Sequence, residues 1–127
     1  MMAPRWIESV VEEFGKAAGI RSFMLNERGA AAVAFENGMG FRLEYAAESL
    51  IAAITVPAAN SPAAARRILA ASHPMARYGL RLKAGYLEKR SCAIFAARLP
   101  DRNVTLPALN AVFAALWRIA TEIGGAL

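Results

Sequence analysis

The sequence has very few of the residues on which disulfides, metal sites and most catalysis depend. It contains one cysteine and one histidine in 127 residues. A single cysteine excludes an intramolecular disulfide framework and is compatible with a reducing compartment. A zinc site would need two or more carboxylates as ligands, and no spacing of acidic residues suggests one. We therefore expect no metal, no cofactor and no enzymatic activity.

The lone histidine and the lone cysteine both have simple structural explanations. His73 precedes a proline at a helix end, and no nucleophile or orienting acid lies near it in the sequence. Cys92 stands beside Ala93 and Ile94 in an apolar stretch, which is typical of a small core residue. The sequence also lacks a glycine-rich phosphate-binding pattern. No residue is predicted to be catalytic.

Long apolar runs are missing as well. The longest stretch without a charged residue, 49–65, is interrupted by Pro57, Asn60 and Pro62, so it cannot span a membrane. The N-terminus has no basic cluster followed by an apolar run, and Glu8 appears early, so we expect no signal peptide. The chain is predicted to be soluble and cytoplasmic.

What the chain does contain is enough apolar material for one folded domain over residues 1–127. Hydrophobic residues make up 57% and charged residues 20% of the sequence, which excludes a disordered segment. The net charge of +5 is unevenly spread, because residues 1–63 carry −2 and residues 64–127 carry +7. A basic half of this kind indicates an acidic partner, nucleic acid or an anionic surface, or simply a solvated face.

The first half of the chain predicts one helix followed by strands. Apolar residues recur at helical spacing between Pro4 and Ala18, and Gly19 supplies a stop. Alternating or continuous apolar patterns then predict extended segments at 23–25, 33–35, 39–45 and 50–56. The last of these is either a separate strand or an extension of the one before it, so three or four strands are expected. Asn37-Gly38 is a strong hairpin signal.

The second half predicts a helix, two strands and a long final helix. These elements are expected at 62–72, 80–86, 92–99 and 105–122. The segment 92–99 is apolar on both faces, which is typical of a strand covered on two sides. The final helix has a wide apolar stripe suited to packing across a sheet. The order helix, three or four strands, helix, two strands, helix indicates an α+β domain with a twisted antiparallel sheet.

A basic nucleic-acid-binding domain is the alternative function. The basic residues of the second half could form a face, and Tyr78 and Tyr86 could stack on bases. However, Tyr86 shares the apolar phase of its strand with Leu80 and Leu82, and no known nucleic-acid-binding motif is present. We therefore favour a protein that binds protein.

Several segments resemble the class I chaperones of bacterial type III secretion, the Tir chaperone or CesT-like family. In the first half these are Trp6-Ile7-Glu8, FGKAAGI at 14–20, LNERG at 25–29, VAFE at 33–36 and FRLEY at 41–45. In the second half, LRLKAGYL at 80–87 and RLPDRNVTLPALNAVFAALWRI at 98–119 are similar to the SycN type in particular.

The resemblance implies a fold and a function. The family fold is a helix, three strands, a helix, two strands and a helix. Its members are small cytoplasmic dimers without ATPase activity that hold the N-terminal segment of a secreted protein in extended, secretion-competent form. The SycN type pairs with a second small chaperone and serves the gatekeeper of the export channel. The expected partners are therefore a secreted gatekeeper or effector and a second chaperone, in a homodimer or a heterodimer.

The resemblance also implies where these partners bind. Client contact is expected on the first helix and early strands, at Phe14, Phe23, Leu25, Val33 and Phe35. The dimer interface is expected on the middle helix and the strand after it, at Ile68, Leu69, Leu80, Leu82, Ala84 and Tyr86. Such chaperones are usually acidic, whereas this chain has a pI near 10.0. Two basic interface regions would repel, so we expect an acidic partner chaperone.

Overall fold

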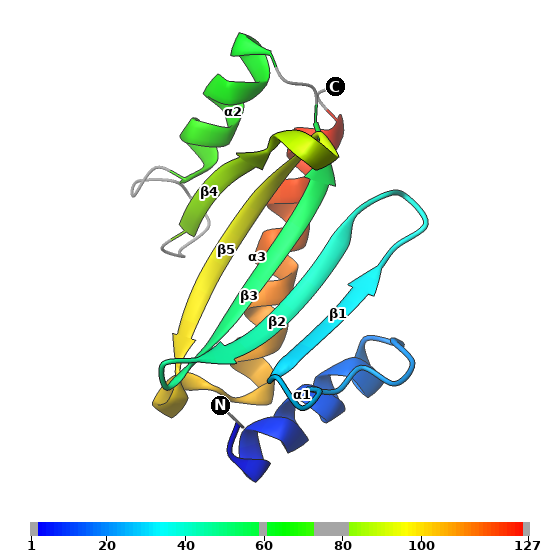
Figure 1. The fold of residues 1–127 in the computed structure, drawn as a ribbon, viewed down its shortest axis with the longest axis vertical. Coiled ribbons are helices and arrows are strands. Elements are labelled where there is room, and N and C mark those ends of the chain that lie inside the picture. The colour runs from blue at the N-terminus through cyan, green and yellow to red at the C-terminus, as the bar shows by residue number, and fades with distance from the viewer. Residues whose placement is uncertain (1–2, 59–60, 73–81, 126–127) are drawn as a thin grey trace.

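A computed structural model describes residues 3–58, 61–72 and 82–125 of the chain (Figure 1). The elements follow in the order α1 (Arg5–Ala17), β1 (Ala30–Ala34), β2 (Gly40–Ala46), β3 (Ser49–Pro57), α2 (Pro62–Ser72), β4 (Leu82–Leu87), β5 (Cys92–Pro100) and α3 (Leu106–Gly125). Two single-turn 3₁₀ helices, η1 (Glu88–Arg90) and η2 (Asp101–Asn103), flank β5. The predicted α+β order is confirmed, with three strands before the middle helix.

The strands form one antiparallel sheet in the order β1-β2-β3-β5-β4. Strands β1 and β4 are therefore its two edges. The predicted hairpin joins β1 to β2: Gly38 adopts a φ of +87°, and the Asn37 side chain accepts a hydrogen bond from the Met39 N–H at 3.0 Å. Glycine is favoured where φ is positive, which explains the turn position.

Helices α1 and α3 cover one face of the sheet, and α3 runs along β3 (Figure 1). The core lies between them. Phe41, Ile54 and Phe95 stand side by side on β2, β3 and β5, and all three are fully buried. Leu109 and Leu116 of α3 are buried against this layer. One-sided burial explains why the residues of β2 alternate between buried and exposed.

The prediction of a strand at 23–25 is wrong. No strand lies between α1 and β1. Phe23 and Leu25 are buried and Met24 is 52% exposed, so the alternation in the sequence reflects an irregular segment packed on the core. Asn26 then turns the chain into β1, because its side-chain oxygen accepts hydrogen bonds from the N–H groups of Arg28 and Ala30.

The prediction that β5 is covered on two sides is not met by the described part of the chain. Ala93, Phe95 and Ala97 point toward the helices and are buried, whereas Ile94 and Ala96 lie on the opposite face and are only half-buried. Cys92 is a buried free thiol, as expected for a small core residue. Among the described elements, the helices lie on one side of β5, so its second apolar face has no cover of this kind.

Helix α3 is long and apolar enough to cross a membrane by length and composition alone. Its position explains part of this composition, because Leu109, Leu116 and Ile119 are completely buried in the core.

Candidate protein-binding surfaces

Strand β1 is an edge strand without the usual protection against pairing. Its sequence, Ala30–Ala34, contains no charged residue and no proline. Within the described residues it pairs with β2 alone. Asn26 occupies the start of the edge, since it exchanges backbone and side-chain hydrogen bonds with Ala30. The rest of the strand is open to a further strand.

The hydrogen bonds of the hairpin fix which backbone groups face outward. The Phe35 N–H donates to the Met39 carbonyl at 2.8 Å, and a second bond of the same length closes the other end of the strand pair. Hydrogen-bonded positions alternate along an antiparallel pair. Ala32 and Ala34 therefore direct their N–H and C=O groups away from the sheet. Both residues are exposed, so these groups form a ready edge for pairing.

An apolar groove lies beside the end of β1. It is lined by Phe35 from the hairpin, by Ala18 after α1, and by Phe113, Ala114, Trp117, Arg118, Thr121 and Glu122 from α3. Its volume is about 710 Å³. We call it the aromatic groove because Phe35, Phe113 and Trp117 form its apolar wall. These three rings are half-buried, which leaves part of each ring accessible.

The rings of the aromatic groove continue into the core. Phe113 lies edge-on to Phe41 at a centroid distance of 4.7 Å and to Phe14 at 5.4 Å. Trp117 lies 5.8 Å from Phe113. Aromatic pairs at such distances stabilise one another beyond the area they bury. The groove wall is therefore rigidly supported rather than a loose patch.

The five residues predicted to bind the client fall into two groups. Phe14, Phe23 and Leu25 are buried, with exposed fractions of 1%, 4% and 8%. Val33 and Phe35 are half-buried at the β1 edge, and Phe35 lines the aromatic groove.

The sequence predicts a wide apolar stripe on the final helix but does not predict that Phe113 and Trp117 line a binding surface. The width of that stripe is the available signal for them.

The residues predicted for the dimer interface lie on α2 and β4, apart from Leu80, which is outside the described residues. Four of them are buried or half-buried: Ile68, Leu82, Ala84 and Tyr86. They face the helix side of the sheet, where α2 contacts β4, and the Tyr86 hydroxyl donates to the Ala58 carbonyl at 2.9 Å. Leu69 is 68% exposed on α2.

The polar groups of the described residues offer little chemistry. No group of three or more histidine, cysteine, aspartate or glutamate side chains in that part of the chain could hold a metal ion. Tyr45 donates a hydrogen bond from its hydroxyl to Asp101 Oδ2 at 2.9 Å. Burial, and then this bond, raise the pKa of the Tyr45 hydroxyl above its ordinary value of 10.0. This hydrogen bond links β2 to η2 and has a structural role.

Among the described residues, the basic side chains of the second half do not gather with stacking rings. Arg66 and Arg67 lie on α2, Lys83 on β4 and Arg90 on η1. Tyr78 lies outside the described residues. Neither this arrangement nor the comparisons below support the nucleic-acid alternative.

Solved structures share this fold. A chain of the ExsC–ExsE complex matches with a TM-score of 0.79 and 22% identity, over 98% of this chain and 95% of that one. A chain of the HopA1–SchA chaperone–effector complex matches with a TM-score of 0.73 and 15% identity, over 98% and 99%. The Yersinia pestis type III secretion chaperone SycH in complex with a YscM2 fragment gives 0.68 and 15%, over 92% and 98%.

The sequence itself matches a family model. A search of curated proteins gives no match. The model described as the type III secretory system chaperone SycN matches residues 6–124, which is nearly the whole chain. The chain belongs to the SycN family of type III secretion chaperones.

Proposed function

We propose that this chaperone binds the N-terminal segment of a secreted gatekeeper or effector by adding it, in extended form, as a strand beside β1. The observation that carries the proposal is the uncharged edge of β1, where Ala32 and Ala34 direct their backbone groups outward. Main-chain hydrogen bonds at a sheet edge give affinity for an extended segment of almost any sequence. A segment held in this way stays unfolded until it is released.

The aromatic groove supplies the side-chain contacts of this proposal. In a strand added beside β1, every second side chain points to the helix face of the sheet. Those side chains approach the groove wall of Phe35, Phe113 and Trp117. Burial of an apolar client side chain there contributes roughly 25 cal/mol for each Å² removed from water. The client is therefore expected to carry apolar residues at alternating positions.

The chaperone is further proposed to act as a cytoplasmic dimer without enzymatic activity. The surface formed by α2 and β4 is the proposed interface, with the exposed side chain of Leu69 at its outer side. The partner is either a second copy or a second small chaperone. The basic charge of residues 64–127 favours an acidic second chaperone. Light scattering gives the mass of the purified chain at low and high salt and so distinguishes a homodimer from a heterodimer. A tight homodimer whose mass does not change with salt contradicts the proposal of an acidic partner.

Copurification tests the proposed function. The tagged full-length chain is expressed in its own bacterium, and the bound proteins are identified by mass spectrometry. We expect one exported protein, and we expect its N-terminal segment alone to be sufficient for binding. Loss of the chaperone should abolish export of that protein. Recovery of nucleic acid in place of protein, or of a client bound through a folded domain, would contradict the proposal.

A further inference from the structure

The face of the sheet opposite α1 and α3 is apolar along its centre. Ile51, Ala53 and Thr55 of β3 lie on it, and Ile94 and Ala96 of β5 stand beside them in register. All five are half-buried, although helices α1 and α3 lie on the other side. We call this surface the open face. A strand that meets water on one side normally carries polar residues there, so these apolar residues indicate a cover.

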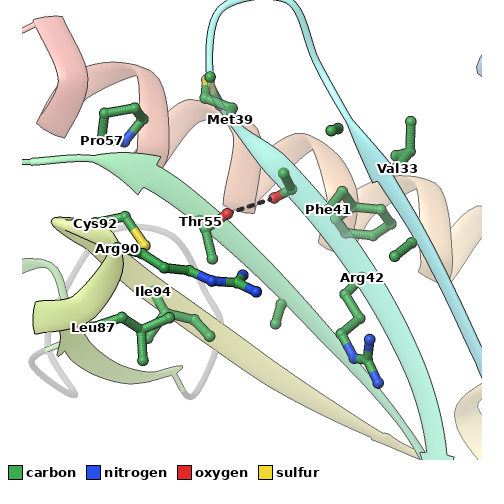
Figure 2. Close-up of a pocket in the computed structure, with 15 residues that line it drawn as sticks. Val33, Met39, Phe41, Arg42, Thr55, Pro57, Leu87, Arg90, Cys92 and Ile94 are labelled. Carbon is green, nitrogen blue, oxygen red and sulfur yellow. Dashed lines mark hydrogen bonds between the residues drawn. The ribbon is translucent and has the colours of Figure 1, made fainter.

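The open face is hollowed rather than flat. A depression of about 720 Å³ lies over β1, β2, β3 and β5, with small or aliphatic residues in its floor, such as Gly40, Ala53 and Ile94. Figure 2 shows two arginines at this depression. Arg90 extends from η1 past Ile94, and Arg42 extends from β2 on the other side of the depression.

The charges on the open face are mostly positive. Four basic side chains come from the outward positions of the strands and from η1: Arg42, Lys83, Arg90 and Arg98. Glu44 is the acidic residue at an outward position of these strands, and it pairs with Arg42 at 3.5 Å. Arg98 donates from Nε to Ser49 Oγ at 2.8 Å. In the part of the chain that the structure describes, Arg90 forms no ion pair.

The charge and shape of the open face together restrict the class of molecule that could bind there. A second copy of this chain would bring the same basic groups against each other, and like charges across an interface are unfavourable. Nucleic acid would match the charge, but the floor is aliphatic and offers no exposed ring on which a base could stack. An acidic polypeptide with small apolar side chains matches both the aliphatic floor of the depression and the two arginines beside it.

We propose that the open face binds an acidic, apolar segment of a different protein. The apolar side chains of that segment rest on Ala53, Thr55 and Ile94, and its carboxylates pair with Arg42 and Arg90. This surface adjoins the β1 edge, because Ala32 and Ala34 also line the depression. It differs in chemistry, since it uses side chains on a sheet face, whereas strand addition uses backbone groups at a sheet edge. The chaperone therefore has two protein-binding surfaces that work by different chemistry.

Nuclear magnetic resonance of the full-length chain tests this proposal. The probe is a short synthetic peptide with isoleucine and alanine at its centre and glutamate at both ends. We expect it to shift the amide resonances of Ala53, Thr55 and Ile94, which lie on the central strands beneath the depression. The double variant Arg42→Glu/Arg90→Glu should bind the peptide about tenfold more weakly, because both ion pairs become repulsive.

Two controls make the test specific. Arg5→Glu/Arg102→Glu changes the net charge equally at exposed positions away from the open face, so it should bind the peptide as the unchanged chain does. A peptide with glutamine in place of glutamate should bind about tenfold more weakly than the acidic one. Equal binding of the two peptides, shifts confined to the β1 edge, or a salt-insensitive dimer that protects the open-face amides would overturn the proposal.

Discussion

The ring of Phe35 lies edge-on to the indole of Trp117, with their centroids 5.1 Å apart and their planes at 84°. Phe35 follows β1 at the hairpin, and Trp117 lies in the middle of α3. The contact therefore ties the edge strand to the helix that backs the sheet. It makes the outward backbone of β1 and the aromatic groove parts of one rigid surface.

Removal of the indole should affect client binding more than stability. Trp117 is half-buried, so we expect Trp117→Ala to lower the free energy of unfolding by only about 2 kcal/mol. The affinity for the client segment should fall by about tenfold or more, because a groove wall is lost. Urea unfolding and titration calorimetry measure the two quantities. Leu116→Ala is the control. Truncation of this fully buried side chain should lower the free energy of unfolding by about 2–5 kcal/mol, while the protein that remains folded still binds the client.

A proline at the outer edge of β1 should block strand addition without unfolding the chaperone. The N–H of Ala32 points away from β2, so Ala32→Pro removes a donor that the folded chain does not use. We expect the thermal midpoint to change little and client binding to be lost. Calorimetric unfolding and client pull-down provide the measurements.

The neighbouring position serves as the matched control. Ala31 lies at a position that bonds to β2, so Ala31→Pro should break the ladder and lower the free energy of unfolding by about 3 kcal/mol. If Ala32→Pro still captures the client with unchanged affinity, strand addition at β1 is excluded.

Gly15 should not tolerate a side chain, although it lies inside a helix. A Cβ atom at this position would stand 2.7 Å from the Phe23 Cβ and 3.1 Å from the Phe23 carbonyl oxygen. We expect Gly15→Ala to destabilise the protein by about 1–2 kcal/mol, because overpacking outweighs the gain in helix propensity. Ser9→Ala, at an exposed position of the same helix, should stabilise the protein slightly because alanine has the higher helix propensity. Chemical unfolding of both variants checks this, and a Gly15→Ala protein of undiminished stability would contradict the packing described.

Tyr45 should keep its proton to a higher pH than an ordinary tyrosine. Burial and the bond to Asp101 raise its pKa, so the folded chain keeps the proton at a pH where the unfolded chain releases it. Stability from this hydroxyl is thus present below pH 10 and is lost as the pH rises through the folded pKa. Absorbance titration of tyrosinate should show a component above pH 10 that Tyr45→Phe removes. A variant that keeps the component above pH 10 and loses tyrosinate absorbance at lower pH instead would refute the assignment.

The sequence predicted the elements whose pattern depends on local geometry. The Asn37-Gly38 turn could be predicted because a positive φ favours glycine. The alternation of β2 could be predicted because burial on one face only favours apolar residues at every second position. The false strand at 23–25 had the same alternation, since a loop packed on the core also buries every second residue. Periodicity alone could not separate the two.

The candidate site was less predictable. Apolar periodicity marks the stripe of α3, but it does not show that Phe113 and Trp117 lie at the margin of the stripe, where rings stay half-exposed. Likewise, β5 does carry apolar residues on both of its faces. No helix covers its second face among the described residues, which no count of apolar residues could show.

The pairing of β3 with β5 has a consequence for synthesis of the chain. These strands pair over their full length, from Ser49 opposite Pro100 to Pro57 opposite Cys92, with α2 and β4 between them in the sequence. A nascent chain that has emerged only as far as α2 holds a three-stranded meander in which β3 pairs with β2 but its other edge, which later pairs with β5, is still open. Contacts between distant segments form late and leave strand edges exposed meanwhile. Before this chaperone can protect an extended client, its own centre has to pass through the same vulnerable state on the ribosome.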